Sequence, residues 1–180
     1  MNPTILTHSG QTFNLINPDP ATIRIEDVAH ALSHLCRFTG HCRDFYSVAE
    51  HSYLSSYAVP SSHALEALLH DAAEAYIGDV SSPLKRLLPD YQAIEQRVEA
   101  AIRRRFGLPE IQSACIKVAD LAMLGAERRD LMPRHSENWA LLDGVDPIGM
   151  SVWPPMSIEG ARKSFLLRFQ DLTAEAQVAA

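Results

Sequence analysis

The sequence predicts an all-α protein folded as a single domain. Its 180 residues suit one domain of ordinary size and hardly suffice for two. Apolar residues recur at helical spacing over most of the chain after residue 20, and glycines and prolines separate these segments. Nearly half of the residues are hydrophobic, which is enough to fill a core.

In the first half of the chain, residues 1–20 are rich in Pro, Asn, Thr and Gly, and 12–16 could form a short strand or hairpin edge. Apolar residues at helical spacing and residues that cap or end helices predict three helices, at about 22–35, 46–59 and 61–78. The segment 37–44 between the first two reads as a loop, because Gly40 interrupts it.

The second half continues with a loop at 79–83 and three further helices, at about 90–106, 110–132 and 157–176. Residues 135–155 read as irregular because glycines and prolines recur there. We therefore expect one domain over 1–180 with its core at about 25–132. An N-terminal extension at 1–20 precedes this core, and an irregular segment with a last helix at 133–180 follows it.

Composition excludes several classes of protein. The formal net charge of −6 argues against a protein that coats polymeric nucleic acid, which needs a basic face. The three cysteines are irregularly spaced, as is typical of reduced thiols rather than of a disulfide framework. Residues 1–17 lack the pattern of a secretion signal, and no apolar run approaches the roughly 20 residues of a membrane helix. We expect a cytoplasmic protein without a membrane partner.

The third predicted helix carries ionisable residues within an apolar run. Apolar side chains surround nearly every side of 64–77, yet His70, Asp71 and Glu74 lie inside this segment. Burying a lone carboxylate is costly unless a partner or a metal compensates the charge. This cluster therefore points to a metal site or a reaction.

Two other predicted helices contribute matching residues. His51 lies in the second helix, and Asp120 lies in an apolar stretch of the fifth. If these two residues face His70 and Asp71, two imidazoles and two carboxylates surround one position, a set that suits a divalent ion such as Co, Mn, Zn, Fe or Mg. The adjacent His70 and Asp71 diverge by about 100° on a helix but can share an ion above the edge between them.

Four short segments in this order carry a resemblance to a known family. They are Ala49–Ser52, His70–Glu74, Gly78–Lys85 and Lys117–Asp120. This pattern resembles the HD-domain phosphohydrolases, in particular their 5'-deoxynucleotidase branch, near the phage dATP triphosphohydrolases, and spans roughly Ile25 to Met132. The resemblance implies an HD-type helical bundle, one divalent ion, hydrolysis of phosphate esters of nucleotides, and a homo-oligomer.

Two carboxylates are candidate catalytic groups. Glu74 lies four residues after His70, so on a helix it shares that face and could orient water or transfer a proton. The resemblance implies a similar role for Glu74. It also places Asp79 at the active site, where this residue could hold water or a sugar hydroxyl.

Substrate contacts are predicted near the same centre. Cations must offset the acidic site for a phosphate to bind, and the nearest candidates are Arg37, Lys85 and Lys117. Arg37 has a planar fork suited to phosphate, and the resemblance implies this role. The residue after this arginine is often tryptophan in the family; here it is Phe38, which could stack on a base or sugar. The loop with Ser82 and Pro83 would form part of the sugar pocket and select deoxyribose.

Other interpretations stay open. Hydrolysis of a deoxynucleoside triphosphate to nucleoside and triphosphate would use the same ligands. A non-catalytic nucleotide-binding protein, or hydrolysis of cyclic dinucleotides or alarmones, are further alternatives. We interpret the segment 127–130 as a solvated or interfacial cluster of ion pairs, and Trp139 and Trp153 as anchors of the irregular segment on the core.

Overall fold

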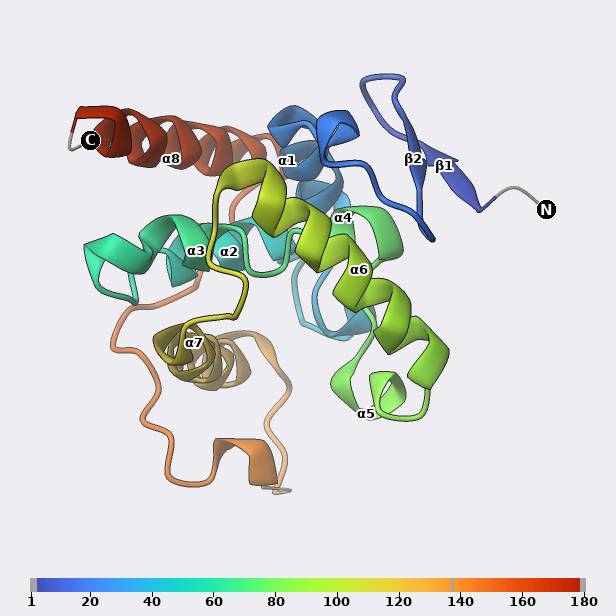
Figure 1. Ribbon diagram of the computed structural model, residues 1–180. Helices are drawn as coiled ribbons and strands as arrows, with labels where there is room; N and C mark the ends of the chain where they lie inside the picture. Colours follow the sequence, from blue (N-terminus) through green and yellow to red (C-terminus); the bar gives the residue numbers. More distant parts are fainter. Residues whose placement is uncertain (1–2, 137, 179–180) are drawn as a thin grey trace.

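The computed structural model describes residues 3–136 and 138–178, and in this part of the chain the regular structure is mainly helical (Figure 1). The α-helices are α1 (Ile25–His34), α2 (Val48–Ser55), α3 (Ala64–Leu68), α4 (Glu74–Ile77), α5 (Ser82–Lys85), α6 (Pro89–Phe106), α7 (Ala114–Leu131) and α8 (Ile158–Val178). Short 3-10 turns are η1 (Pro20–Thr22), η2 (Phe38–Gly40), η3 (Ser61–His63) and η4 (Ala140–Leu142). The predicted all-α single domain is confirmed.

The N-terminal segment forms a small hairpin. Strand β1 (Thr4–Leu6) pairs antiparallel with β2 (Thr12–Asn14), so the predicted strand is present and ends two residues earlier than expected. Phe13 points into the core and stacks on Tyr76, with ring centroids 4.0 Å apart. The hairpin thereby covers one end of the helical core.

The core lies among α1, α2, α3 and α8, with α6 crossing in front of them (Figure 1). Buried apolar residues from these helices form one cluster, including Val28, Leu32, Leu68 and Phe165. A second cluster under α7 contains Tyr46, Met123, Leu131 and Val152. Because α2 packs against both α8 and α7, it connects the two clusters and holds its residues between them.

The third predicted helix is interrupted, which corrects the sequence prediction. Helix α3 ends at Leu68 and α4 begins at Glu74, with a series of turns over 69–73. In these turns the amide of Ala72 donates to the carbonyl of Leu69, and that of Glu74 to Asp71, so the spacing is tighter than in an α-helix. His70 and Asp71 therefore lie on a turn, and the 100° separation of an ideal helix does not apply.

Other boundaries differ by a few residues. Helix α1 begins after Arg24 rather than near Thr22, α2 is shorter than predicted at both ends, and α7 begins at Ala114 rather than at Glu110. The predicted loop at 79–83 leads into α5. The prediction for α6 is confirmed, with Gly107 in the left-handed conformation at its end.

Within the described residues, no helix combines the length and the apolar composition that crossing a bilayer requires.

Candidate metal centre

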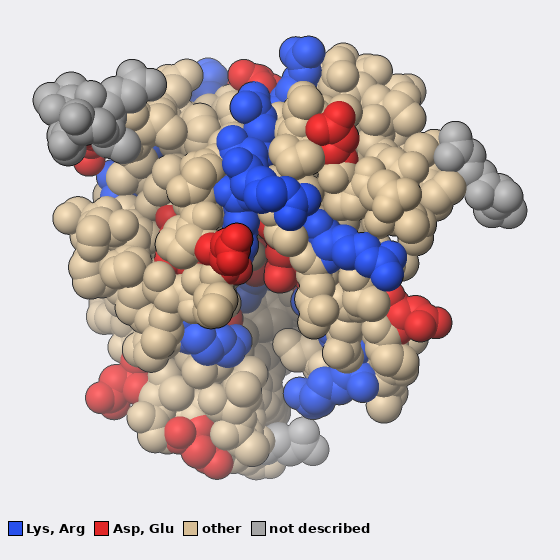
Figure 2. Space-filling model, in the orientation of Figure 1, with Lys and Arg blue, Asp and Glu red and all other residues tan. Residues whose placement is uncertain are grey.

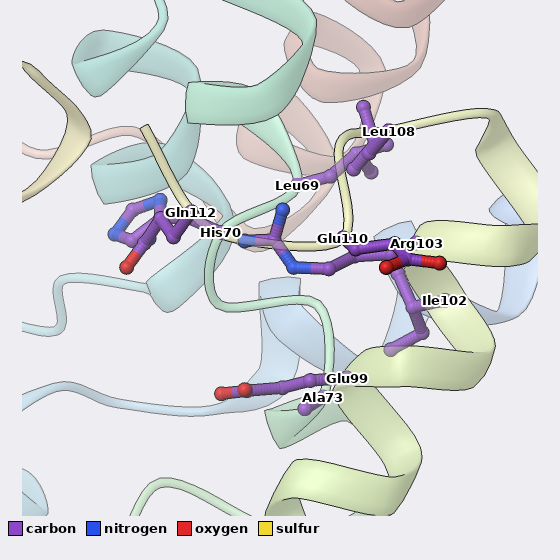
Figure 3. A pocket seen from close by; sticks show the side chains of 9 residues that line it. All are labelled: Leu69, His70, Ala73, Glu99, Ile102, Arg103, Leu108, Glu110 and Gln112. Atoms are coloured by element: carbon purple, nitrogen blue, oxygen red, sulfur yellow. The ribbon is translucent and has the colours of Figure 1, made fainter. Parts of the chain in front are cut away.

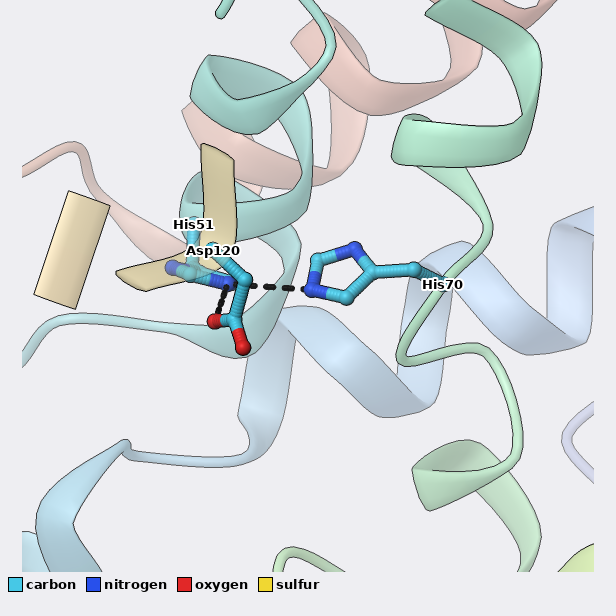
Figure 4. Close-up of side chains that lie close together, drawn as sticks. All are labelled: His51, His70 and Asp120. Carbon is cyan, nitrogen blue, oxygen red and sulfur yellow. Dashed lines mark hydrogen bonds and ion pairs between the residues drawn. The ribbon is translucent and has the colours of Figure 1, made fainter. Parts of the chain in front are cut away.

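Side chains from three separated segments converge at one position between α2, α7 and the turn after α3. His51 comes from α2, His70 from the turn, and Asp120 from α7, and one ligand atom of each lies within 4.8 Å of those of the other two (Figure 4). Asp71 joins them, with its Oδ2 3.3 Å from His70 Nε2 and 3.6 Å from His51 Nε2. The four residues predicted as ligands therefore lie together.

The two imidazoles present matching nitrogen atoms to the centre. His70 Nδ1 lies 2.7 Å from the carbonyl oxygen of Ala67, and His51 Nδ1 lies 2.5 Å from Glu127 Oε1. Since both of these partners accept hydrogen bonds, each Nδ1 carries a proton that points away from the centre. The Nε2 atoms then offer lone pairs, which is how histidine is oriented in metal sites by the partner of its other nitrogen.

The separations fit one coordination shell. Ligand atoms about 2.1 Å from a common ion lie about 3.0–3.4 Å from one another in tetrahedral or octahedral arrangements. The two Nε2 atoms are 3.2 Å apart, and His51 Nε2 lies 3.4 Å from Asp120 Oδ1. Two facing lone pairs at this distance repel unless a positive species lies between them. A divalent cation meets this requirement, and a proton on His51 is the alternative.

Glu127 is a residue of the candidate site that the sequence interpretation missed. It is completely buried and binds both His51 and Arg37, whose Nη2 lies 3.0 Å from Glu127 Oε2. Burial opposes ionisation, yet Arg37 and His51 lower the pKa of Glu127 to about 2. The interpretation of 127–130 as a solvated or interfacial cluster of ion pairs is therefore wrong for Glu127. Arg129 and Asp130 do pair with each other. Glu127 follows Asp120 by two helical turns, a spacing that could have indicated the shared face.

The same contacts determine the charge of His51. Burial and the nearby Arg37 lower its pKa, but Glu127 and Asp120 outweigh them and raise it to about 9. Burial likewise opposes ionisation of Asp120, but hydrogen bonding and charge from His51 bring the pKa of this carboxyl well below its usual range. The centre is therefore an anionic pocket that attracts either a proton or a metal cation.

Arg37 lies beside this centre rather than at the surface. Its Nη1 is 3.6 Å from Asp71 Oδ2, and only 12% of its side chain is exposed. Burial disfavours the charge, but Glu127 and Asp71 raise the pKa of the guanidinium further above its normal value. A fixed, permanently charged group therefore lies next to the predicted ligand Asp71, where it can meet an anion.

The predicted catalytic carboxylates lie on the next segment. Glu74 begins α4 and is buried, and its Oε2 has no hydrogen-bond partner among the described residues. Burial and the neighbouring Asp71 and Asp79 raise the pKa of Glu74 well above its usual value. Burial also raises the pKa of Asp79. Burial and neighbouring acids thus favour the protonated form of Glu74 beside the candidate ligand Asp71.

The predicted lysines differ in their surroundings. Lys85 Nζ lies 2.5 Å from Glu95 Oε1 on α6, so its charge is paired. Lys117 Nζ lies 2.8 Å from Asp120 Oδ2, and its side chain is 59% exposed. Ser82 and Pro83 begin the short helix α5 and are exposed. Phe38 follows Arg37 and contacts it, with the guanidinium carbon 5.6 Å from the ring centroid.

A small cavity of about 120 Å³ adjoins the centre (Figure 3). His70 lines it together with apolar side chains such as Leu69 and Ile102, and Glu99 and Arg103 of α6 supply charged groups. Figure 2 shows Lys and Arg side chains in a band along this face of the molecule, with the surface hollowed below the band. His70 therefore belongs to the candidate ligand set and also lines a space that solvent can reach.

Comparisons with known proteins identify two relatives. The chain is 45% identical over 169 residues to the uncharacterized protein YfdR of Escherichia coli (strain K12), and the match covers 94% of this chain and 95% of that protein. It is 40% identical over 121 residues to the uncharacterized protein RCAP_rcc00048 of Rhodobacter capsulatus, covering 62% of each chain. No protein-family model matches the chain.

Proposed function

We propose that this chain, which belongs to the family of the uncharacterized protein YfdR of Escherichia coli, is a divalent-metal-dependent phosphohydrolase. Its proposed substrates are 5'-deoxynucleotides, and its products are a nucleoside and phosphate. The resemblance to HD-domain phosphohydrolases motivates the reaction class. The arrangement of His51, His70, Asp71 and Asp120 supports it.

One observation carries the proposal: the two Nε2 atoms lie 3.2 Å apart while both Nδ1 protons point outward. His51, His70, Asp71 and Asp120 would hold the ion. A divalent ion supplies Lewis-acid stabilisation of phosphoryl charge and lowers the pKa of an attacking water. The mixed nitrogen and oxygen donors suit Mn, Co, Fe or Zn, and Mg is the hardest ion in the range we propose to test.

Glu74 is the proposed proton donor. Leaving of the nucleoside requires a proton on its 5'-oxygen, and a general acid must hold that proton at neutral pH. Burial and nearby acidic groups raise the pKa of Glu74, a shift in the direction that a general acid requires. Asp79, with its own pKa raised by burial, is proposed to hold a hydroxyl of the sugar.

Arg37 is the proposed phosphate-binding residue. Its guanidinium is fixed by Glu127 and lies 3.6 Å from Asp71, so it needs little reorganisation to meet an anion at the centre. Lys117 is more exposed, and its ammonium is paired with Asp120. Because Lys85 is paired with Glu95, less positive charge is available for additional phosphates. This difference favours a monophosphate over a triphosphate as substrate.

The test is a product assay with purified protein. The chelator-treated protein is supplied separately with Mn, Co, Zn, Fe or Mg and incubated with dAMP, AMP and dATP, and the products are separated by chromatography. We expect phosphate and nucleoside from dAMP, slower reaction with AMP, and no reaction without metal. Release of triphosphate from dATP, with dAMP left intact, would mean that the substrate is a deoxynucleoside triphosphate and not a monophosphate.

A matched pair of variants controls this assay. Asp120→Asn removes a proposed ligand, whereas Asp90→Asn makes the same change at an exposed position at the start of α6. We expect hydrolysis to fall by more than about 100-fold in the first variant and to stay near wild type in the second. If the metal-loaded protein binds nucleotides but cleaves none of them, it is a nucleotide-binding protein and the proposed enzyme is wrong.

A further inference from the structure

We propose that Trp139, together with Phe38, forms a stacking surface for the nucleobase of the substrate. This inference rests on the proposed function and deepens it. It assigns the substrate class as phosphate esters that carry an aromatic heterocycle, and it distinguishes nucleotides from simple sugar phosphates.

A continuous set of contacts leads from the candidate metal centre to Trp139. Asp71 lies 3.6 Å from the guanidinium of Arg37, and the guanidinium carbon lies 5.6 Å from the ring centroid of Phe38. The Phe38 ring is in turn 6.1 Å from the Trp139 ring, with their planes inclined by 47°. The aromatic pair therefore begins next to the residue proposed to hold the phosphate.

The backbone of Phe38 adopts an unusual conformation. Its φ is 56°, and that of the following Thr39 is 54°, which places two consecutive non-glycine residues in the left-handed region. A bulky side chain there is strained and persists only when the surroundings hold it, a situation that is frequent in ligand sites. This strained turn, which forms η2, presents the Phe38 ring to Trp139.

Trp139 is oriented without being part of the buried core. Its side chain is half-buried, and it belongs to neither cluster of buried residues, so the interpretation of Trp139 as an anchor on the core does not account for its position. The guanidinium carbon of Arg128 lies 5.2 Å from its ring centroid, and His135 lies 6.1 Å away. A tryptophan held in place but still accessible offers the flat surface on which bases stack.

The segment that carries Trp139 reaches this position through the tertiary fold. Trp139 precedes η4, which packs against α7, the helix that supplies Asp120 and Glu127 (Figure 1). Phe38 comes from the loop after α1, a hundred residues earlier in the chain. Three separate parts of the chain thus meet beside the proposed phosphate site. They are the loop after α1, helix α7 and the segment before α8.

Fluorescence provides a direct test, because the chain contains only two tryptophans. Trp153→Phe leaves Trp139 as the single indole reporter. This variant, loaded with Mg or Zn, is titrated with a dAMP analogue whose bridging oxygen is replaced by carbon so that it is not cleaved. We expect saturable quenching by this analogue and none by 2-deoxyribose 5-phosphate. An unchanged emission while calorimetry detects binding of the analogue would overturn the proposal.

Kinetics of substituted proteins provide the second measurement. Trp139→Leu should raise KM for dAMP by about 5-fold to 150-fold, the range expected from one lost base stack, with little change in kcat. KM for 2-deoxyribose 5-phosphate should not change. Trp139→Phe keeps an aromatic face and should recover most of the loss, which separates stacking from a general effect on folding.

The outcomes distinguish this inference from the proposed function. If Trp139→Leu cleaves dAMP with the wild-type KM, stacking on Trp139 is wrong while the phosphohydrolase assignment stands. If the wild-type protein cleaves no phosphate ester, the proposed function fails and the fluorescence titration alone decides the stacking site. In that case quenching by the analogue supports the site, and its absence overturns it.

Discussion

Glu127 Oε1 lies 2.5 Å from His51 Nδ1, although the two residues are 76 positions apart in the chain. The same carboxylate binds Arg37 through its other oxygen. A buried acid on α7 thus orients a proposed metal ligand and a proposed phosphate-binding residue together. Changes at Glu127 should therefore affect both ion and substrate without removing any group that touches either.

Glu127→Gln should weaken metal binding. The amide oxygen can still accept from His51 Nδ1, but the negative charge that strengthens the imidazole as a donor to the metal is lost. We expect a 10-fold to 100-fold lower metal affinity, as is typical when the partner of a metal-bound histidine is changed. Calorimetric titration with Mn or Zn measures it. Glu159→Gln is the control because that side chain is 57% exposed. Equal affinities in the two variants would refute the assigned role of Glu127.

Metal binding should release a proton below pH 9. The pKa of His51 is about 9, because Glu127 and Asp120 outweigh burial and the charge of Arg37, so His51 is protonated in the metal-free protein at neutral pH. A metal needs the neutral imidazole and must displace that proton. The apparent affinity should therefore rise about tenfold per pH unit between pH 7 and pH 8.5 and level off above about 9.

The measurement is calorimetry at pH 7.5 in two buffers that differ in ionisation enthalpy. The difference between the observed heats gives the number of protons released, which we expect to be close to one per ion from His51. Equal heats in both buffers would mean that the site is already deprotonated. The assigned pKa would then be incorrect.

Glu95→Gln should strengthen phosphate binding. Lys85 is now paired with Glu95, and neutralising this partner frees the charge of Lys85 for an anion at the neighbouring centre. The pair is partly exposed, so its interaction is worth no more than about 1 kcal/mol and the gain in affinity should be at most about 5-fold. Inhibition of the proposed activity by inorganic phosphate measures it. Lys85→Met should change the inhibition in the opposite direction; a loss of affinity in Glu95→Gln would contradict this account.

Glu66 should make stability depend on acidic pH. Burial raises the pKa of a carboxyl, but hydrogen bonds from Ser113 and Arg103 outweigh burial here and the pKa of Glu66 is lowered. A group whose folded pKa is depressed stabilises the protein above its unfolded pKa, and that contribution is lost as the pH falls. Thermal unfolding should therefore show a loss of stability that begins near pH 4.5 and continues below it.

Glu66→Gln tests the source of this dependence. The variant should lower the free energy of unfolding at pH 7 by about 1.5–3 kcal/mol, the range for a hydrogen bond to a charged group, and flatten the decline at low pH. Glu159→Gln again serves as the exposed control. An unchanged decline in Glu66→Gln would assign the acid sensitivity to other carboxyls.

Much of the architecture could be predicted from local patterns. Helix α6 was predictable nearly to the residue, because a proline begins it and Gly107 takes the left-handed conformation that ends it. The start of α8 was predictable because Ser157 accepts from the amide of Gly160 as a capping residue does. The break between α3 and α4 was not predictable, because its sequence is rich in good helix formers. The turns over 69–73 contact distant segments of the chain, for example through His70 and His51.

By itself, the sequence determined the all-α fold, because helical spacing is a local property of the chain. It also indicated the four residues that meet at the candidate centre, because ionisable residues within apolar stretches and the four resembling segments can be recognised in the sequence. Only the tertiary structure decided that Glu127 is buried beside His51 and Arg37, that Lys85 is paired with Glu95, and that Trp139 lies against Phe38. The physical reason is that the environment of a charge or a ring depends on what packs around it. For these residues the neighbours come from helices and loops far away in the sequence.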